Sequence, residues 1–383
     1  MDTINSGGVV RLFVCGDIVN VSDKSSIIGP QLSKIIEDAD FAVGNLEGVE
    51  LTAGQVKLKH PSQFTGTIAY LSKVGFDMML LANNHITDFG YDQLHYTINL
   101  LKKNGLYYLG AGFSWEETYR PVIVQVKNFK FGFLNVCEAQ VGQMTNHNQN
   151  FGYAWMSHDK LFDDVKCLSA KVDKVVVFVH AGLEHYTLPL PEIRAFYKRI
   201  SDAGADVVIG GHPHIVQGFE YYKDSFIAYS LGNFYFPHPA GVYEEENKAF
   251  SLMLEFSEEG KIHPKVIYHS QSDGIVEIEN DNANQIDVFK LCEQLENGYE
   301  SKAEEMCLTA YSQICRYLLI QALCGEDENI GFIERIKDII RRILFRKKYI
   351  INTKTYRDKQ LLRLFENESY RFTIIRALKQ ICK

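Results

Sequence analysis

Apolar residues along this chain recur with two different spacings. Short runs rich in β-branched residues are typical of buried strands, whereas apolar positions repeating every three or four residues indicate helices. The first pattern predicts strands at residues 9–15, 41–43, 78–82, 175–179, 207–209 and 226–229. The second predicts helices at residues 27–38, 65–74, 89–103 and 191–203. Strands and helices that alternate in this way predict an α/β fold.

Two further patterns refine the expected sheets. Residues 121–127 and 131–136 flank a turn at Asn128, which predicts a hairpin and therefore a mixed sheet. Strands near residues 250–256 and 265–268 are expected to complete the sheets.

The apolar pattern stops at an acidic, Asn-rich stretch, residues 271–286, where we expect a linker. The linker would separate a main domain, residues 1–270, from a helical C-terminal region, residues 287–383. Within that region, residues 331–349 predict a helix with one apolar and one basic face.

Charge is divided unevenly along the 383 residues. The whole chain carries a formal charge of −8, but residues 331–383 hold 15 Lys and Arg against 5 Asp and Glu, a local +10. The basic helix could lie on an anionic membrane surface or pack its apolar face against the acidic main domain. Nucleic acid is not among the expected partners.

The N-terminus lacks a basic segment followed by an apolar core, and no uninterrupted apolar run reaches 18 residues. The eight cysteines form no C-x-x-C pair, which favours free thiols in a reducing compartment. We therefore expect a cytoplasmic protein, with peripheral attachment at the inner membrane surface as the alternative.

Polar side chains follow the expected strands at their carboxyl ends, where open α/β sheets form their ligand crevice. These side chains belong to Asp17, Glu47, Asn84, His85, His180, His212 and His214. Carboxylates, imidazoles and an amide without a thiolate suit Mn, Zn or Fe, and such an ion supports hydrolysis by lowering the pKa of a water. Individually, each residue also has an ordinary interpretation as a helix cap or a hydrogen-bonded core residue.

The stretch from Gly210 to His214 contributes two of these imidazoles. Paired glycines allow close backbone approach, and an extended His-Pro-His would direct both rings into one pocket. Other histidines have no partner at a suitable spacing and are expected to be structural or exposed, namely His60, His95, His147, His158 and His238. Ser230 does not lie in a nucleophile elbow, which argues against a serine hydrolase.

Six motifs in order resemble those of CapA-type capsule-synthesis (poly-gamma-glutamate) proteins, which are relatives of calcineurin-like metallophosphoesterases. They are Gly16-Asp17, Asn45-Leu46-Glu47, Ala82-Asn83-Asn84-His85 with Asp88 and Gly90, His180-x-Gly-x-Glu184, Gly211-His212-Pro213-His214-x-Val216-Gln217 and Ser230-Leu231-Gly232-Asn233-Phe234. The resemblance covers roughly residues 9–270.

The resemblance implies a four-layer αββα sandwich, followed here by the helical C-terminal region, with a metal site at the sheet edges. In the metallophosphoesterase scheme, Asp17 and His214 would hold one ion and Glu47 would bridge. The second ion would take Asn84, His180 and His212.

Further roles follow from the same resemblance. His85 would act at the leaving group, Asp88 would orient it, and Glu184 and Gln217 would support the site or face substrate. Val19 stands where the phosphoesterases have a histidine, so both one-ion and two-ion sites remain open.

We therefore expect a metal-dependent hydrolase-like protein that acts on a capsular or secreted anionic polymer. A phosphoesterase for a small or lipid-linked phosphate ester and a non-catalytic assembly subunit with a vestigial metal site are the alternatives. The resemblance adds a capsule-synthesis complex to the partners that the basic C-terminal helix could contact.

Overall fold

The computed structural model of the chain describes residues 8–22, 26–52, 60–237, 244–258, 260–319 and 361–382. The basic helix expected at residues 331–349 and the side chain of His238 lie outside these residues.

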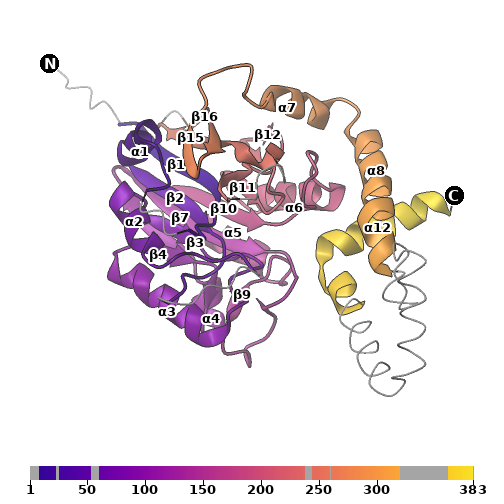
Figure 1. The fold of residues 1–383 in the computed structure, drawn as a ribbon, viewed down its shortest axis with the longest axis horizontal. Helices are drawn as coiled ribbons and strands as arrows, with labels where there is room; N and C mark the ends of the chain where they lie inside the picture. The colour runs from indigo at the N-terminus through magenta and orange to yellow at the C-terminus, as the bar shows by residue number, and fades with distance from the viewer. Residues whose placement is uncertain are drawn as a thin grey trace. The chain divides into compact units, whose positions relative to one another are not determined.

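One of the two large sheets is mixed and has eight strands (Figure 1). Its order is β17-β16-β15-β1-β2-β3-β4, and β14 also pairs with β1. The strands are β1 (Val10–Ile18), β2 (Phe41–Leu46), β3 (Met78–Leu80), β4 (Tyr107–Leu109), β14 (Asn233–Tyr235), β15 (Lys248–Phe256), β16 (Ile262–Ser272) and β17 (Ile275–Ile278). Strands β1 to β4 run parallel, and β15 to β17 extend the sheet in antiparallel fashion.

The second sheet has six strands in the order β12-β13-β11-β10-β7-β6. They are β6 (Val122–Val126), β7 (Phe129–Cys137), β10 (Lys174–His180), β11 (Val207–Gly211), β12 (Phe219–Tyr222) and β13 (Ser225–Ala228). Strands β6 and β7 form the expected antiparallel hairpin. A small sheet, β5 (Ala111–Gly112), β8 (Gln143–Met144) and β9 (Gly152–Ala154), accompanies these two.

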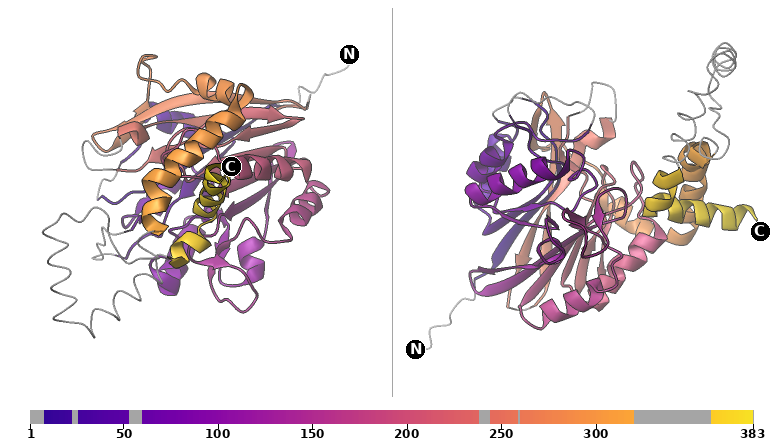
Figure 2. Two further views of the ribbon diagram at one scale, coloured as in Figure 1. Left: turned by 90° about the vertical axis from the view of Figure 1, so that its right-hand side faces the viewer. Right: turned by 90° about the horizontal axis from the view of Figure 1, so that it is seen from below.

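Helices cover the outer faces of both large sheets (Figure 2). The eight-stranded sheet is covered by α1 (Pro30–Glu37), α2 (Thr67–Val74) and α3 (Gly90–Lys103). The six-stranded sheet is covered by α5 (Leu161–Ser169) and α6 (Pro191–Asp202). A short helix, α4 (Trp115–Tyr119), lies beside β5 and β9. The expected four-layer αββα sandwich is therefore confirmed.

The core lies on both faces of the eight-stranded sheet. Along β1, Phe13 faces the helical layer, whereas Leu12 and Val14 face the second sheet. Across the gap between the sheets, the rings of Phe41 and Phe133 stack with centroids 5.5 Å apart. Strands buried on both faces read as continuous apolar runs, which is why the sequence revealed them.

A hairpin occupies part of the stretch where a linker was expected. Strand β17 pairs with β16 through a turn at Asp273 and Gly274, whose φ angles of 52° and 72° suit a tight Asp-Gly turn. Acidic residues around this turn interrupt the short apolar pattern of β17, so the sequence did not predict this strand. The described chain divides instead into compact units at residues 1–298 and 299–383.

Helix α7 (Val288–Glu296) closes the first unit, and its Cys292 accepts a hydrogen bond from the backbone N–H of Phe219. The second unit contains α8 (Tyr299–Ala310), η2 (Tyr311–Cys315) and α12 (Glu368–Ile381). Helix formation in this region agrees with the expectation from sequence. Within the described residues, no helix is both long enough and apolar enough to cross a membrane.

Two glycines let backbone segments meet near the carboxyl ends of the strands. A Cβ on Gly210 would overlap the carbonyl oxygen of Tyr229, and a Cβ on Gly16 would overlap that of Gly232. These close contacts leave no space for any other residue.

We expect Gly210→Ala to lower the free energy of unfolding by about 1–3 kcal/mol, since the added methyl group must displace backbone. Urea denaturation measures this change. Gly8→Ala is the control, because a Cβ there meets nothing within 4 Å, and its stability should match that of the unmodified chain.

Candidate metal centre

The candidate side chains converge because the two sheets present their parallel strand ends at the same edge. In the first sheet, Asp17 of β1 lies opposite Asn45 of β2. In the second sheet, His180 of β10 lies opposite Gly211 of β11. Gly211, the residue before His212 of the Gly-His-Pro-His motif, therefore lies beside His180.

Asp17 is buried at the junction of the two sheets. Its Oδ1 accepts a hydrogen bond of 2.6 Å from Asn45 Nδ2, and its Oδ2 lies 3.6 Å from His214 Nδ1. Ligand atoms of Asp17, Glu47 and His214 all lie within 4.8 Å of one another. These three residues could hold one ion.

Asn84 is oriented with its amide oxygen toward a second group of donors. The oxygen lies 3.1 Å from His180 Nε2, while the amide nitrogen donates to His85 Nε2 and Gln140 Oε1, each at 3.2 Å. An amide coordinates a metal through its oxygen, so this orientation suits a ligand role for Asn84 beside His180.

Both histidines of the Gly-His-Pro-His motif adopt the left-handed backbone region, with φ of 92° at His212 and 63° at His214. The extended conformation expected from sequence is therefore wrong. Proline fixes its own φ angle and does not by itself hold the residues on either side in an extended conformation. Left-handed backbone at residues other than glycine is costly and concentrates at functional sites.

His212 faces two carboxylates. Its Nε2 lies 3.7 Å from Glu138 Oε1 and 3.8 Å from Glu184 Oε1, and Gln140 Nε2 lies 3.1 Å away. Ligand atoms of Glu184, His212 and His214 lie within 4.8 Å of one another. The centre therefore contains more oxygen donors than the sequence indicated.

Glu47 is the most unusual residue of the site. Its side chain is 0% exposed, and within the described part of the chain neither carboxylate oxygen has a hydrogen-bond partner. Burial raises the pKa of Glu47 well above its ordinary range, and the charge of Asp17 adds to this effect. A buried carboxylate without partners is costly, and a divalent cation is the partner that would satisfy it.

The buried imidazoles are held neutral. Burial lowers the pKa of His212 to about 3 and that of His180 well below its usual range. Neutral imidazole carries the lone pair that a metal ion needs, so both rings suit Mn, Zn or Fe without prior loss of a proton.

His214 is held by a chain of buried residues that sequence reasoning did not include. Asn233 Oδ1 lies 3.0 Å from His214 Nδ1, and Asn233 Nδ2 donates to Glu246 Oε2 at 2.9 Å. Glu246 also pairs with His185 Nδ1 at 2.9 Å. A carboxylate only accepts hydrogen bonds, so Glu246 holds the nitrogen of the Asn233 amide toward itself and leaves the amide oxygen toward His214. His214 Nδ1 then donates to Asn233, which leaves Nε2 for a metal.

Asn233 lies in a motif that the sequence singled out, and Glu138 directly follows β7, so the strand-end pattern could have found it. Glu246 carried no recognisable signal. Gln217, expected to support the site or face substrate, donates to the backbone carbonyl of Tyr186 at 2.8 Å. It thereby braces the loop that carries Glu184.

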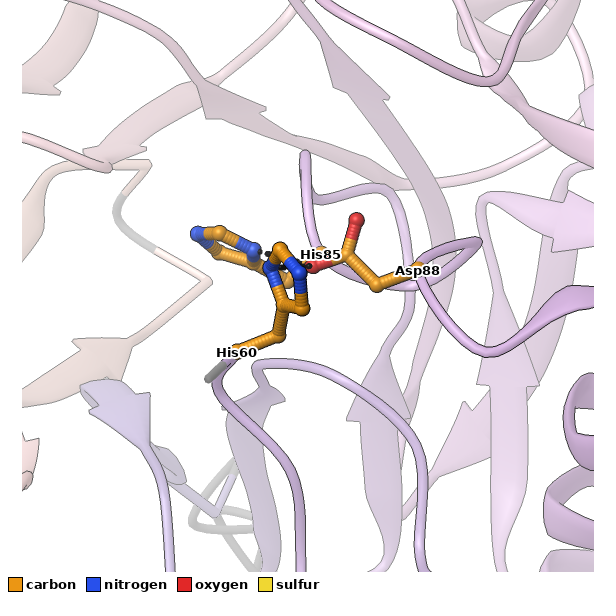
Figure 3. A group of neighbouring side chains, drawn as sticks. All are labelled: His60, His85 and Asp88. Atoms are coloured by element: carbon orange, nitrogen blue, oxygen red, sulfur yellow. Dashed lines mark hydrogen bonds and ion pairs between the residues drawn. The ribbon is translucent and has the colours of Figure 1, made fainter. Parts of the chain in front are cut away.

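His85 and Asp88 form the expected pair, with His85 Nδ1 2.7 Å from Asp88 Oδ2 (Figure 3). His85 Nε2 points the other way and lies 3.8 Å from Glu47 Oε1. His60, expected to be structural or exposed, is exposed, and its Nδ1 lies 3.2 Å from the same Asp88 oxygen. Gln63, three residues later, donates to the backbone carbonyl of Ile18 and anchors this part of the chain beside the site.

We expect Glu47→Gln to stabilise the metal-free protein by about 1–3 kcal/mol at neutral pH, because it removes a buried charge without partners. Metal affinity should fall at the same time. Guanidinium unfolding in a chelator and metal titration measure the two effects. Glu50→Gln is the matched control and should destabilise, since the Glu50 carboxylate accepts backbone N–H bonds from Gly66 and Ile68, each 2.7 Å.

Glu246→Gln should lower metal affinity by about 10–100-fold, because the Asn233 amide would lose its ionised acceptor and His214 its fixed orientation. Calorimetric titration with Mn²⁺ checks this value. Unchanged affinity in Glu246→Gln, or an equal loss in the remote Glu50→Gln variant, would contradict the positioning role.

Part of this chain is similar in sequence to known proteins. The sequence model described as "Bacterial capsule synthesis protein PGA_cap" matches residues 11–238. The capsule biosynthesis protein CapA of Bacillus anthracis is 33% identical over 215 residues, which cover 54% of this chain and 52% of that protein. The PGA biosynthesis protein CapA of Bacillus subtilis is 28% identical over 211 residues, which cover 53% and 54% respectively.

The chain thus spans about half the length of the curated relatives it matches. Among solved structures, a 5′-nucleotidase precursor from Thermus thermophilus aligns with 14% identity and a TM-score of 0.43, covering 78% of this chain and 60% of that chain. A phosphatase from Mycoplasma pneumoniae aligns with 16% identity and a TM-score of 0.44, covering 74% and 99%. On the family match over residues 11–238, the chain belongs to the bacterial capsule synthesis protein PGA_cap family.

Proposed function

We propose that this chain is a metal-dependent hydrolase that acts on an anionic polymer of the poly-gamma-glutamate or capsular polysaccharide type. The observation that carries the proposal is the buried Glu47 carboxylate, which lacks a hydrogen-bond partner among the described residues and lies with ligand atoms of Asp17 and His214 all within 4.8 Å. Such a set of donors binds Mn, Zn or Fe.

The charges of the side chains in the centre are compatible with an anionic substrate only when metal is bound. The side chains that form the centre include carboxylates, amides and imidazoles but no Lys or Arg. A phosphate or carboxylate group approaching Asp17, Glu47 and Glu138 would be repelled unless cations offset their charge. We infer that metal and substrate occupy the site together.

The proposed ligands fall into two overlapping groups. Asp17, Glu47 and His214 would hold one ion, and Asn84, His180 and His212 would hold a second that shares Glu47. When bound, such ions activate water and offset charge on a phosphoryl or carbonyl oxygen.

The remaining residues would serve the reaction directly. His85, oriented by Asp88, would donate a proton to the leaving group. Glu184 lies on the more open side of His212, with 39% of its side chain exposed, where it would face substrate.

One observation favours a second candidate function. Val19 is 1% exposed and supplies no donor at the position where phosphoesterases place a histidine. The first ion would therefore be held weakly. A non-catalytic assembly subunit with a structural or vestigial metal site is the function that fits this difference.

Substitution of a residue that only orients a metal ligand typically lowers metal affinity by about 10–100-fold. We expect His214→Ala, which removes a proposed ligand, to lower it by more than this. Hydrolysis should be lost with the metal. The assay compares phosphodiester and γ-glutamyl oligomer substrates with Mn²⁺ supplied. His95→Ala is the control, because His95 is exposed on α3 and bonds to Asn99 rather than to the centre.

The outcomes separate the candidates. Turnover of γ-glutamyl oligomers that depends on His214 supports polymer processing, whereas dominant phosphodiester turnover favours a phosphoesterase. Bound metal without turnover of either substrate favours the assembly subunit. A wild-type protein that stays metal-free when Mn²⁺ is supplied contradicts both catalytic candidates.

A further inference from the structure

A second group of potential metal ligands lies beside the centre and involves a residue outside the six motifs. His60 Nδ1 and His85 Nδ1 lie 3.2 Å and 2.7 Å from the same oxygen of Asp88 (Figure 3). Ligand atoms of the three residues lie within 4.8 Å of one another. Figure 3 shows both rings on the same side of the Asp88 carboxylate.

The backbone around this group is well braced. His85 and Asp88 share the turn that follows β3, where the buried Asn83 accepts hydrogen bonds from the N–H groups of His85 and Gly48. The His60 ring packs edge-on against Phe89, with centroids 6.3 Å apart. Only side-chain rotations are therefore needed to direct the three donors at one ion.

We propose that His60, His85 and Asp88 form a Zn²⁺ site distinct from the strand-end centre. Two imidazoles and one carboxylate are a common zinc set, and a three-ligand site leaves a position for water. Tetrahedral bonds of about 2.0–2.1 Å place neighbouring ligand atoms slightly farther apart than the observed hydrogen-bonded separations. His85 Nδ1 and the Asp88 oxygen, 2.7 Å apart, would have to separate most, whereas His60, with 50% of its side chain exposed, needs only a small adjustment.

Exposure distinguishes this site from the centre. The side chains of His85 and Asp88 are 23% and 16% exposed, whereas the proposed ligands of the centre are all buried. Zinc at the outer site should therefore exchange quickly and bind more weakly than metal in the centre.

Occupation would have a consequence for catalysis, and this part rests on the proposed function. A His85 ring that binds zinc through Nδ1 no longer donates to Asp88, so the pair that orients the ring is lost. Excess zinc would then inhibit hydrolysis, and His60 would be the residue that makes the chain sensitive to it.

Equilibrium dialysis against Zn²⁺ tests the site without any activity measurement. We expect His60→Ala to bind one equivalent fewer than the unmodified chain, while His95→Ala, another exposed histidine, binds the full number. His214→Ala, which disrupts the centre, should still bind the one equivalent of Zn²⁺ that belongs to the outer site. Equal zinc binding by His60→Ala and the unmodified chain would overturn the proposal.

Kinetics then test the inhibitory consequence separately. His60→Ala should keep its basal hydrolysis and require at least about 10-fold more Zn²⁺ for inhibition, as expected when one outer ligand is lost. An unchanged inhibition profile would refute the inhibitory role even if the zinc equivalent is lost. Absence of hydrolysis in the unmodified chain would count against the proposed function, while the dialysis result would still decide the zinc site.

Discussion

The desolvation of negative charge where the two sheets meet is the constraint on which this structure depends. Burial raises the pKa of Asp17 and of Glu47, and Glu47 lacks a compensating hydrogen bond within the described residues. A protein interior tolerates such carboxylates only when protons or cations accompany them. The metal-free fold is therefore under electrostatic stress that metal binding would relieve.

The surrounding structure holds the donors in place at a further cost. His212 and His214 keep left-handed backbone conformations, and Gly16 and Gly210 bring neighbouring strands into contact. Hydrogen bonds through Asn233 and Glu246 offset part of this strain and select the ring nitrogen that faces the centre. Strain and support together pre-organise a site that would otherwise relax.

Long, regular elements were predictable because their residues repeat with the period of one type of structure. Helix α3 and strand β10 match the expected ranges closely, as does the β6–β7 hairpin. Helix α5 and strand β17 were missed, since polar residues interrupt their apolar pattern and packing against neighbours such as β10 and β16 stabilises them.

The sequence by itself determined the order of the strands with polar ends and the chemical types of the donors. Local patterns suffice for this, because a run of apolar residues followed by Asp17 or His180 describes both a strand and its end. Tertiary structure alone decided which other residues reach the centre. Glu138 directly follows β7 and Glu246 lies in the short 3-10 helix at Glu244–Asn247, and the fold brings them to His212 and His185 respectively. It likewise brings His60 to Asp88, beside the centre. Proximity of this kind is a property of the folded sheets, so no local spacing in the chain encodes it.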